Sequence, residues 1–450
     1  MMPSTLSRLT PLLALYGSRM AGVLVSLLFI PFFARSLGSE QFGLVALVLS
    51  IQAMLITLDL GMSALLGRDI AAADSNRPPA LLQWRQAERL LSTAMLVLAG
   101  LVLTAVAALA PAHLADSLLA MILFWAVLLQ NLSQAAMLAR RAYQQAGAIQ
   151  IIGVLGRAGL TALALSWVQA SFSAFLLTQV LGALAHLAAN RHYCKQWLGA
   201  DKLEIGATSA RAPETLTHLF RRGLPLFITG LAGALVTQLD KSIVALFMGP
   251  STVSPYFLAT TFSMLPIALL AMPVAQFFQP HIVRSCSDGD APALLCHTRR
   301  LSAALVAAVI VPTCLIWAAR DPLIMLWLHD EALAARVAEL VAVLLPAAAL
   351  GAIGTIPLAL LSGLQDFKFQ ARLSTALAIG TLACVLIFAS EGSLIAVCWA
   401  YLGYYVSLTA SLWLRAASSS VSVAAARQSA LIAGLAGLVA LPPTAFLAGR

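Results

Sequence analysis

Five charged residues lie inside long apolar segments of this sequence: Arg19, Asp59, Arg157, Asp240 and Lys241. An ionised side chain at the centre of a bilayer costs about 2.5–3.5 kcal/mol on insertion scales, so such residues are candidates for binding or transport. Arginine forms bidentate hydrogen bonds with phosphate, and a buried aspartate can bind a coupling ion or neutralise an arginine. These residue types therefore favour an anionic ligand that is recognised within a membrane.

Three of these charges, in the first half of the chain, are expected at one depth. At 1.5 Å per helical residue, Arg19 and Arg157 lie about 13 Å, and Asp59 about 11 Å, from the inner ends of their helices. Two cations and one anion at that level form either a water-filled cavity of net positive charge or a buried ion-pair cluster. The first alternative makes Arg19 and Arg157 substrate-binding residues, whereas the second makes them structural.

Asp240 and Lys241 are neighbours in sequence, so on a helix they point about 100° apart and are not expected to face each other. Lys241 is a third candidate for a cationic cavity, although its long side chain can also extend to the membrane surface. Asp240 has a shorter side chain. It is therefore predicted to couple transport to an ion or to contact the other half of the protein.

Uncharged polar residues mark two further helix faces. Gln130 and Gln134 are spaced i, i+4, while Gln179, His186 and Asn190 are spaced i, i+7, i+11. Such stripes more often join membrane helices than bind ligands, but a groove for sugars uses the same residue types. The three glutamines and His186 are thus candidates for a polar lining, and for His186 helix packing is favoured over a proton relay.

Several chemistries are excluded by the motifs that the sequence lacks. The six cysteines have no metal-site spacing, so neither a metal site nor a disulfide framework is expected. The sequence contains no phosphate-binding loop with a Gly-Lys pair, no nucleophile elbow and no His-Glu-x-x-His. We therefore expect no cofactor and no enzymatic activity.

The composition indicates which elements must position the candidate residues. Of 450 residues, 61% are hydrophobic and 10% charged, against about 45–50% and about 25% in soluble domains. The chain is therefore expected to be an all-α polytopic membrane protein, because the alternation typical of a membrane barrel is missing. The expected spans are Thr10–Phe33, Gln41–Leu66, Leu90–Ala110, Leu118–Ala139, Ala148–Val168, Phe172–Ala189, Gly223–Met248, Pro255–Phe278, Leu301–Ala319, Val337–Leu361, Leu373–Ala389 and Leu394–Leu414. A last run, Ser429–Leu447, is either a thirteenth span or a re-entrant hairpin.

The charges indicate orientation. The net charge is +9, from 27 Lys and Arg against 18 Asp and Glu, and most of the basic residues fall in the loops on one side. That side is cytoplasmic by the positive-inside rule, and so is the N-terminus. The excess thus marks a membrane side rather than a nucleic-acid partner. The outer loops are short and nearly uncharged, which leaves no place for the catalytic residues of a membrane glycosyltransferase or polymerase.

The spans divide into two halves. We expect a six-helix lobe over residues 1–190, a cytoplasmic linker over 191–222, a second six-helix lobe over 223–415 and an extra C-terminal helix or hairpin over 416–450. Leu37-Gly38-Ser39 follows the first span of one lobe, and Met248-Gly249-Pro250 follows the first span of the other. An even number of spans gives both lobes the same orientation, so they would be related by a pseudo-two-fold axis along the membrane normal. This architecture is common in secondary transporters, which bind substrate between the lobes.

Short motifs follow these spans in a fixed order: Phe33–Leu44, Leu58–Gly61, Gly223–Leu226, Gln238–Lys241, Leu326–Leu328 and Leu360–Leu364 with Ala371-Arg372. Their order resembles that of the bacterial polysaccharide and O-antigen flippases of the multidrug/oligosaccharidyl-lipid/polysaccharide exporter superfamily. The resemblance runs from residue 10 to residue 415. Two features depart from it: His329-Asp330 stands in place of a Gly-led turn, and the last apolar run is extra to a twelve-span core.

The resemblance implies a flippase that moves an undecaprenyl-pyrophosphate-linked oligosaccharide from the inner to the outer leaflet of the bacterial cytoplasmic membrane by alternating access. Without an ATP motif, the energy would come from an ion gradient or the membrane potential. Expected partners are membrane lipids, a polysaccharide polymerase and glycosyltransferases. One alternative is an ion-coupled multidrug exporter, but the spans of the first lobe contain more arginine than aspartate, which disfavours it. The other is a lipid II flippase, which typically has two extra C-terminal spans.

Overall fold

The computed structural model describes residues 5–57, 59–71, 80–140, 142–199, 216–420 and 422–440. These residues are almost entirely helical, and none of them lies in a β-strand. Ten of the helical segments within the described ranges are long and apolar enough to cross a membrane. The chain is therefore an all-α polytopic membrane protein, as predicted. It forms two compact units, residues 1–239 and 240–450.

The first unit contains the first six expected spans. Its first helix, α1, combines two of them and is interrupted at Gly38, where the backbone leaves the helical conformation. The helices are α1 (Thr5–Thr57), α2 (Met62–Ala71), α3 (Ala80–Leu109), α4 (Leu114–Ala139), α5 (Tyr143–Trp167) and α6 (Phe172–Gly199), with the short 3₁₀-helix η1 (Pro111–His113) before α4.

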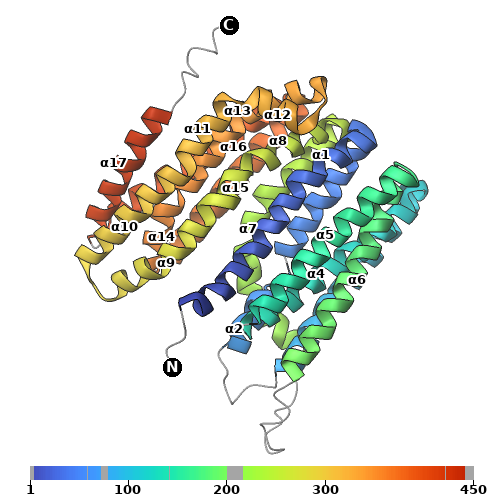
Figure 1. Ribbon diagram of the computed structural model, residues 1–450, viewed down its shortest axis with the longest axis horizontal. Coiled ribbons are helices and arrows are strands. Elements are labelled where there is room, and N and C mark those ends of the chain that lie inside the picture. The colour runs from blue at the N-terminus through green and yellow to red at the C-terminus, as the bar shows by residue number, and fades with distance from the viewer. Residues whose placement is uncertain are drawn as a thin grey trace, which may run out of the picture. The chain divides into compact units, whose positions relative to one another are not determined.

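Packing in the first unit centres on α4, α5 and α6. Helix α6 packs against both α4 and α5, and α5 packs against α1 (Figure 1). Large side chains such as Phe42, Trp84, Leu129 and Phe175 are fully buried within this unit. Apolar burial of this kind, with small residues where helices approach closely, holds membrane helices together.

The second unit repeats the same plan with more interruptions. Helix α7 (Leu216–Met248) enters it, and the division between the two units falls within this helix, between Leu239 and Asp240. Much of the expected 191–222 linker lies outside the described residues, and so do residues 441–450 at the end of the last apolar run. The remaining elements are α8 (Pro250–Pro266), η3 (Ile267–Ala271), α9 (Met272–Ser287), α10 (Ala291–Leu305), η4 (Val306–Ile310), α11 (Val311–Ala318), α12 (Arg320–Leu328), α13 (Glu331–Ile353), α14 (Thr355–Gly363), α15 (Phe367–Ser390), α16 (Leu394–Ala417) and α17 (Val423–Ala440).

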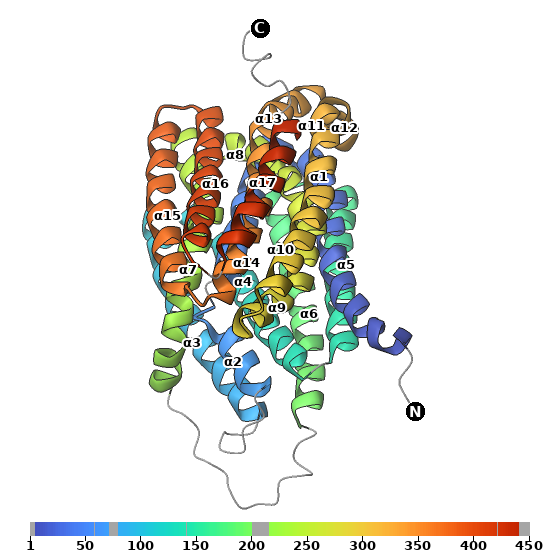
Figure 2. The ribbon, with the colours of Figure 1, turned by 90° about the vertical axis from the view of Figure 1, so that its left-hand side faces the viewer.

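The two units share a contact pattern. In the first, α4 and α5 both pack against α6, and α2 packs against α4. In the second, α13 and α15 both pack against α16, and α8 packs against α13; α15 and α16 lie side by side in Figure 2. In each unit the fourth and fifth spans thus contact the sixth, and the second contacts the fourth. The repeat expected from the sequence is present within the units.

The His329-Asp330 turn takes the conformation that a glycine would usually provide. His329 ends α12 with a left-handed backbone (φ 54°), and Asp330 then accepts a hydrogen bond at Oδ1 from the backbone N–H of Leu333, 3.1 Å away. Aspartate is a favoured N-cap because its carboxylate satisfies an amide at the start of a helix. The turn between α12 and α13 therefore forms with histidine in place of glycine, and α13 still starts with a capped amide.

Candidate functional site

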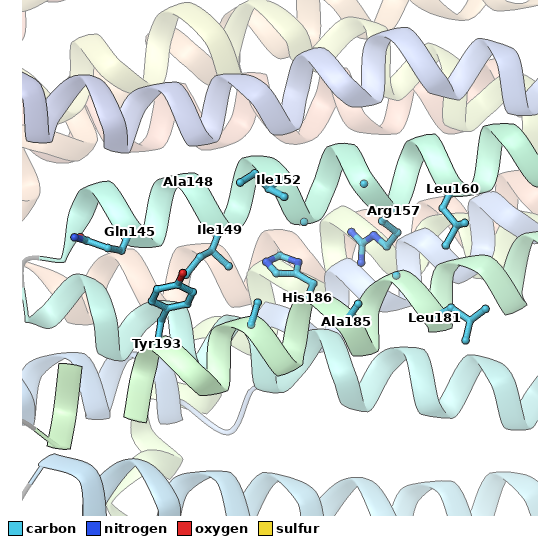
Figure 3. Close-up of a pocket in the computed structure, with 14 residues that line it drawn as sticks. Gln145, Ala148, Ile149, Ile152, Arg157, Leu160, Leu181, Ala185, His186 and Tyr193 are labelled. Atoms are coloured by element: carbon cyan, nitrogen blue, oxygen red, sulfur yellow. The ribbon is translucent and has the colours of Figure 1, made fainter. Parts of the chain in front are cut away.

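A pocket of about 670 Å³ lies between α5 and α6 in the first unit (Figure 3). Its polar side chains belong to Gln145, Arg157, His186 and Tyr193, and the other lining residues are Ala, Gly, Ile and Leu. Arg157 carries the only full charge among the residues that line it. Figure 3 shows Arg157 and His186 pointing into the space between the two helices.

Arg157 brings an unsatisfied hydrogen-bond donor to this pocket. Its Nη1 atom is buried and has no hydrogen-bond partner among the described residues. A buried donor without an acceptor costs about 1–3 kcal/mol, and more when it is charged. The guanidinium is therefore ready to donate to an anion that enters the pocket.

His186 forms the wall beside Arg157. It is 4% exposed, and neither ring nitrogen has a hydrogen-bond partner in the described part of the chain. Its ring packs directly on Gly153, where an added Cβ would overlap the imidazole. His186 thus packs between α5 and α6 and also lines the pocket.

Two glycines set the spacing of α5 and α6 at this point. An added Cβ on Gly182 would lie 3.0 Å from Arg157 Cγ and 3.1 Å from Arg157 Cα. Gly153 faces His186 while Gly182 faces Arg157, so the contact is reciprocal. Sequence reasoning missed both glycines. The available signal was their position, because each precedes a polar residue of its own helix by one turn.

The helix bounds place Arg19 and Arg157 farther from their helix starts than the sequence predicts. Helix α5 begins at Tyr143 rather than Ala148, so Arg157 lies about 21 Å from its start and about 15 Å from its end at Trp167. Gly38 lies at the same membrane side as Trp167, since successive spans reverse direction. Arg19 lies about 28 Å from Gly38 and about 21 Å from the start of α1 at Thr5, whereas Asp59 lies beyond the end of α1 at Thr57. Arg157 is thus near the middle of its span.

Asp59 stabilises a helix start. Its Oδ2 accepts a hydrogen bond from the backbone N–H of Ser63 at 2.9 Å, and its backbone carbonyl accepts one from Met62 at 3.0 Å. The residue is 5% exposed and lies at the break between α1 and α2. Its carboxylate therefore satisfies a backbone amide in the first turn of α2. Arg19 is part of α1, but its side chain lies outside the described residues.

The three glutamines join helices. Gln130 donates from Nε2 to the carbonyl of Ala183 at 2.6 Å, which links α4 to α6. Gln134 donates to the carbonyl of Ala146 at 3.0 Å and links α4 to α5. Gln179 donates to Thr161 Oγ1 at 3.0 Å and links α6 to α5. None of the three lines the α5–α6 pocket, so of the four candidates for a polar lining only His186 does.

In the second unit, Asp240 and Lys241 form a buried ion pair, and the expectation that they would not face each other is wrong. Lys241 Nζ lies 3.1 Å from Oδ1 and 3.2 Å from Oδ2 of Asp240, and Lys241 is 6% and Asp240 1% exposed. The four-carbon lysine stem is long and flexible enough to fold back past the angle of about 100° between the two Cβ directions. A buried charge requires such a partner.

Tyrosines complete this cluster. Tyr256 donates its hydroxyl to Asp240 Oδ2 at 2.6 Å, its ring lies 5.9 Å from Lys241 Nζ, and Tyr401 also hydrogen-bonds Asp240. Sequence reasoning did not find the tyrosines, because no spacing connects α8 and α16 to α7. Lys241 is therefore held by Asp240 and is not a free cation for a cavity.

This chain has the architecture of a membrane transporter: two helical units that repeat one contact pattern, with ionisable residues buried inside the spans. The model of the polysaccharide biosynthesis protein family matches residues 12–285, more than half of the chain. The chain belongs to that family. A comparison with curated protein sequences gives no match.

Solved structures with the same fold are transporters. A lipid II flippase, MurJ, in an inward closed conformation has 12% identity and a TM-score of 0.67, with 94% of this chain and 91% of that chain covered. An outward-facing multidrug resistance MATE transporter of the MOP superfamily has 12% identity and a TM-score of 0.63, with 94% and 96% covered. A MOP superfamily transporter from Pyrococcus furiosus, described as having a binding pocket of reverse polarity, has 14% identity and a TM-score of 0.58, with 90% and 94% covered. Family and fold together indicate a transporter or flippase rather than an enzyme.

Proposed function

We propose that this protein is a flippase that moves a polyprenyl-pyrophosphate-linked oligosaccharide from the cytoplasmic to the outer leaflet of the bacterial inner membrane, for surface polysaccharide biosynthesis. The observation that carries the proposal is Arg157, a guanidinium inside a span whose buried Nη1 has no partner among the described residues and which lines a pocket. Membership of the polysaccharide biosynthesis family supports the class of substrate.

The chemistry of a lipid pyrophosphate matches this arginine. A phosphate oxygen would accept the unused N–H, and the guanidinium fork can bind two oxygens at once. In the apolar surroundings of the span, this attraction is stronger than it is in water. Binding would offset the cost of carrying the anionic group into the membrane, while the polyprenyl chain stays in the hydrocarbon layer.

Translocation itself would proceed by alternating access of the two units, with the N-terminus in the cytoplasm. The sequence has no ATP-binding loop, so the driving force would be an ion gradient or the membrane potential. Asp240 remains the candidate for coupling to an ion; its carboxylate is occupied by Lys241 and Tyr256 in this conformation. Glycosyltransferases would act before this step and a polymerase after it.

A lipid II flippase is the second candidate, because the structural similarity to one such flippase is substantial. Its substrate also carries a polyprenyl pyrophosphate, so Arg157 fits both. A multidrug exporter is less well supported, because cationic drugs would be repelled by a pocket whose charged side chain is an arginine.

The decisive experiment measures flipping by the purified protein in vesicles. Lipid-linked oligosaccharide and lipid II are each labelled on the sugar, and the fraction reached by an added membrane-impermeant enzyme is followed over time. We expect the oligosaccharide carrier to become accessible faster than in protein-free vesicles. In cells, deletion of the gene should abolish a surface polysaccharide and leave its lipid-linked unit facing the cytoplasm. Faster flipping of lipid II would favour the second candidate, and no flipping of either lipid would refute both.

A further inference from the structure

We infer that the pocket between α5 and α6 is a lateral groove for the lipid carrier, which takes the phosphate from one membrane face to the middle of the bilayer and recognises the carrier rather than the sugar. The inference rests on the proposed function and deepens it by naming the part of the substrate that this site binds.

The position of the lining residues gives the groove its direction. They extend along α5 from Gln145 to Leu160, about 22 Å at 1.5 Å per residue. Gln145 and Tyr193 lie at one end and Arg157 towards the other (Figure 3). Tyrosine is typical of the level of the lipid headgroups, whereas Arg157 lies near the middle of its span. The groove therefore leads from the headgroup level to the Arg157 guanidinium, whose buried Nη1 has no partner among the described residues.

The edges of the groove fit a hydrocarbon chain. Ile152 is 71% exposed, Leu181 52% and Leu160 40%, and all three line the pocket. Large apolar side chains exposed on a membrane span face lipid. A polyprenyl chain can thus lie along these residues while its phosphate is inside the groove, so the chain need not leave the bilayer.

The walls of the groove do not fit a sugar. Apart from Arg157, His186 and the two residues at the mouth, the lining is aliphatic or glycine. Sugar hydroxyl groups buried against such walls would lose their hydrogen bonds to water without replacement. His186, which has both ring nitrogens unpaired in the described structure, provides a second polar contact for a phosphate beside Arg157. The site therefore has partners for the anion and the chain, and not for the oligosaccharide.

Binding of sugar-free carrier tests the inference. The full-length protein in nanodiscs is titrated with polyprenyl pyrophosphate, its oligosaccharide-linked form, phosphatidylglycerol and inorganic pyrophosphate, with binding detected by native mass spectrometry. We expect the first two lipids to bind with Kd values within about threefold of each other, and Arg157→Gln to weaken both at least tenfold. The matched control is Arg284→Gln, since Arg284 has an 85% exposed side chain in the other unit; it should change neither Kd.

A second measurement does not depend on the stability of an Arg157 variant. A photoreactive residue replaces Ala185, which lines the groove, or Ala188, which is exposed on α6 but does not line it. We expect the carrier to crosslink at position 185 at least fivefold more than at 188.

Three outcomes would overturn the inference: equal crosslinking at both positions, an affinity for phosphatidylglycerol equal to that for polyprenyl pyrophosphate, or an affinity for inorganic pyrophosphate equal to that for polyprenyl pyrophosphate. If the protein flips lipid-linked oligosaccharide but gives any of these results, the proposed function is retained and the lipid-carrier groove is rejected. Arg157-dependent carrier binding without flipping would remove the proposed function and keep the site.

Discussion

Gly38 and Gly249 have nearly the same backbone conformation, with φ 74° and ψ 170° at the first and φ 85° and ψ 160° at the second. Gly38 joins the first expected span to the second, and Gly249 joins α7 to α8. This region of backbone space is open to glycine and almost closed to residues with a Cβ. The similarity of Leu37-Gly38-Ser39 and Met248-Gly249-Pro250 in the sequence therefore reflects one turn used twice.

Replacing either glycine should destabilise the protein. Gly38→Ala and Gly249→Ala would each cost about 1–3 kcal/mol, because the turn is strained for alanine whatever the space around it. The control is Gly100→Ala: Gly100 is within α3 and has nothing within 4 Å of an added Cβ, so this change should be neutral or stabilising by up to about 1 kcal/mol. Thermal unfolding in detergent measures all three. Equal melting temperatures would contradict the shared turn.

Replacing His329 with glycine should have the opposite effect on stability. It adopts a left-handed backbone (φ 54°), which costs a residue with a Cβ about 1–2 kcal/mol. His329→Gly should therefore raise the thermal stability in detergent, by up to about 1 kcal/mol after the extra chain entropy of glycine is subtracted. A lower melting temperature would show that the imidazole makes contacts that outweigh the strain.

Arg157→Ala should slow transport at normal levels of membrane insertion. A hydrogen bond to a charged group contributes about 1.5–3 kcal/mol, so a loss of roughly 10- to 100-fold is expected. The transport rate of Arg157→Lys should lie between those of the wild type and Arg157→Ala, since a lysine keeps the charge but not the bidentate geometry. Arg19→Ala is predicted from the sequence alone to act in the same direction. Flipping rates in vesicles, normalised to inserted protein, measure these effects, and full transport by the Arg19→Ala/Arg157→Ala double variant would show that neither arginine binds substrate.

Asp240→Asn should be strongly destabilising because it leaves the Lys241 ammonium buried without its counter-charge. Breaking a buried pair from one side costs about 3–5 kcal/mol, whereas removing both charges is often neutral. Asp240→Asn/Lys241→Met should therefore recover most of the stability in thermal unfolding, because the amide oxygen of the introduced asparagine can still accept the Tyr256 hydroxyl. If the double variant is stable but does not transport, Asp240 has a coupling role; if it transports normally, the pair is structural. Wild-type stability of Asp240→Asn alone would contradict the ion pair.

The sequence predicted the features that a single segment encodes. Apolar length located the spans, and a charge within one of them identified Arg157. Features that depend on two segments were not predicted. The position of His186 beside Arg157 depends on the register of α5 against α6, and the Tyr256–Asp240 bond depends on the packing of α8 against α7. The pairing of Lys241 with Asp240 was missed because helix angles describe Cβ directions and not the reach of a long side chain.

The register of α5 against α6 can be tested through Gly182. Gly182→Ala would place a methyl group 3.0 Å from Arg157 Cγ and 3.1 Å from its Cα; the backbone atom cannot move unless the helices separate. Overpacking of this kind costs about 1–3 kcal/mol. Gly156→Ala is the matched control, since Gly156 lines the same pocket and has nothing within 4 Å of an added Cβ. We expect thermal unfolding in detergent to show a loss for Gly182→Ala and little change for Gly156→Ala, and the same order in carrier binding. Equal effects of the two substitutions would mean that Gly182 does not set the distance between Arg157 and α6.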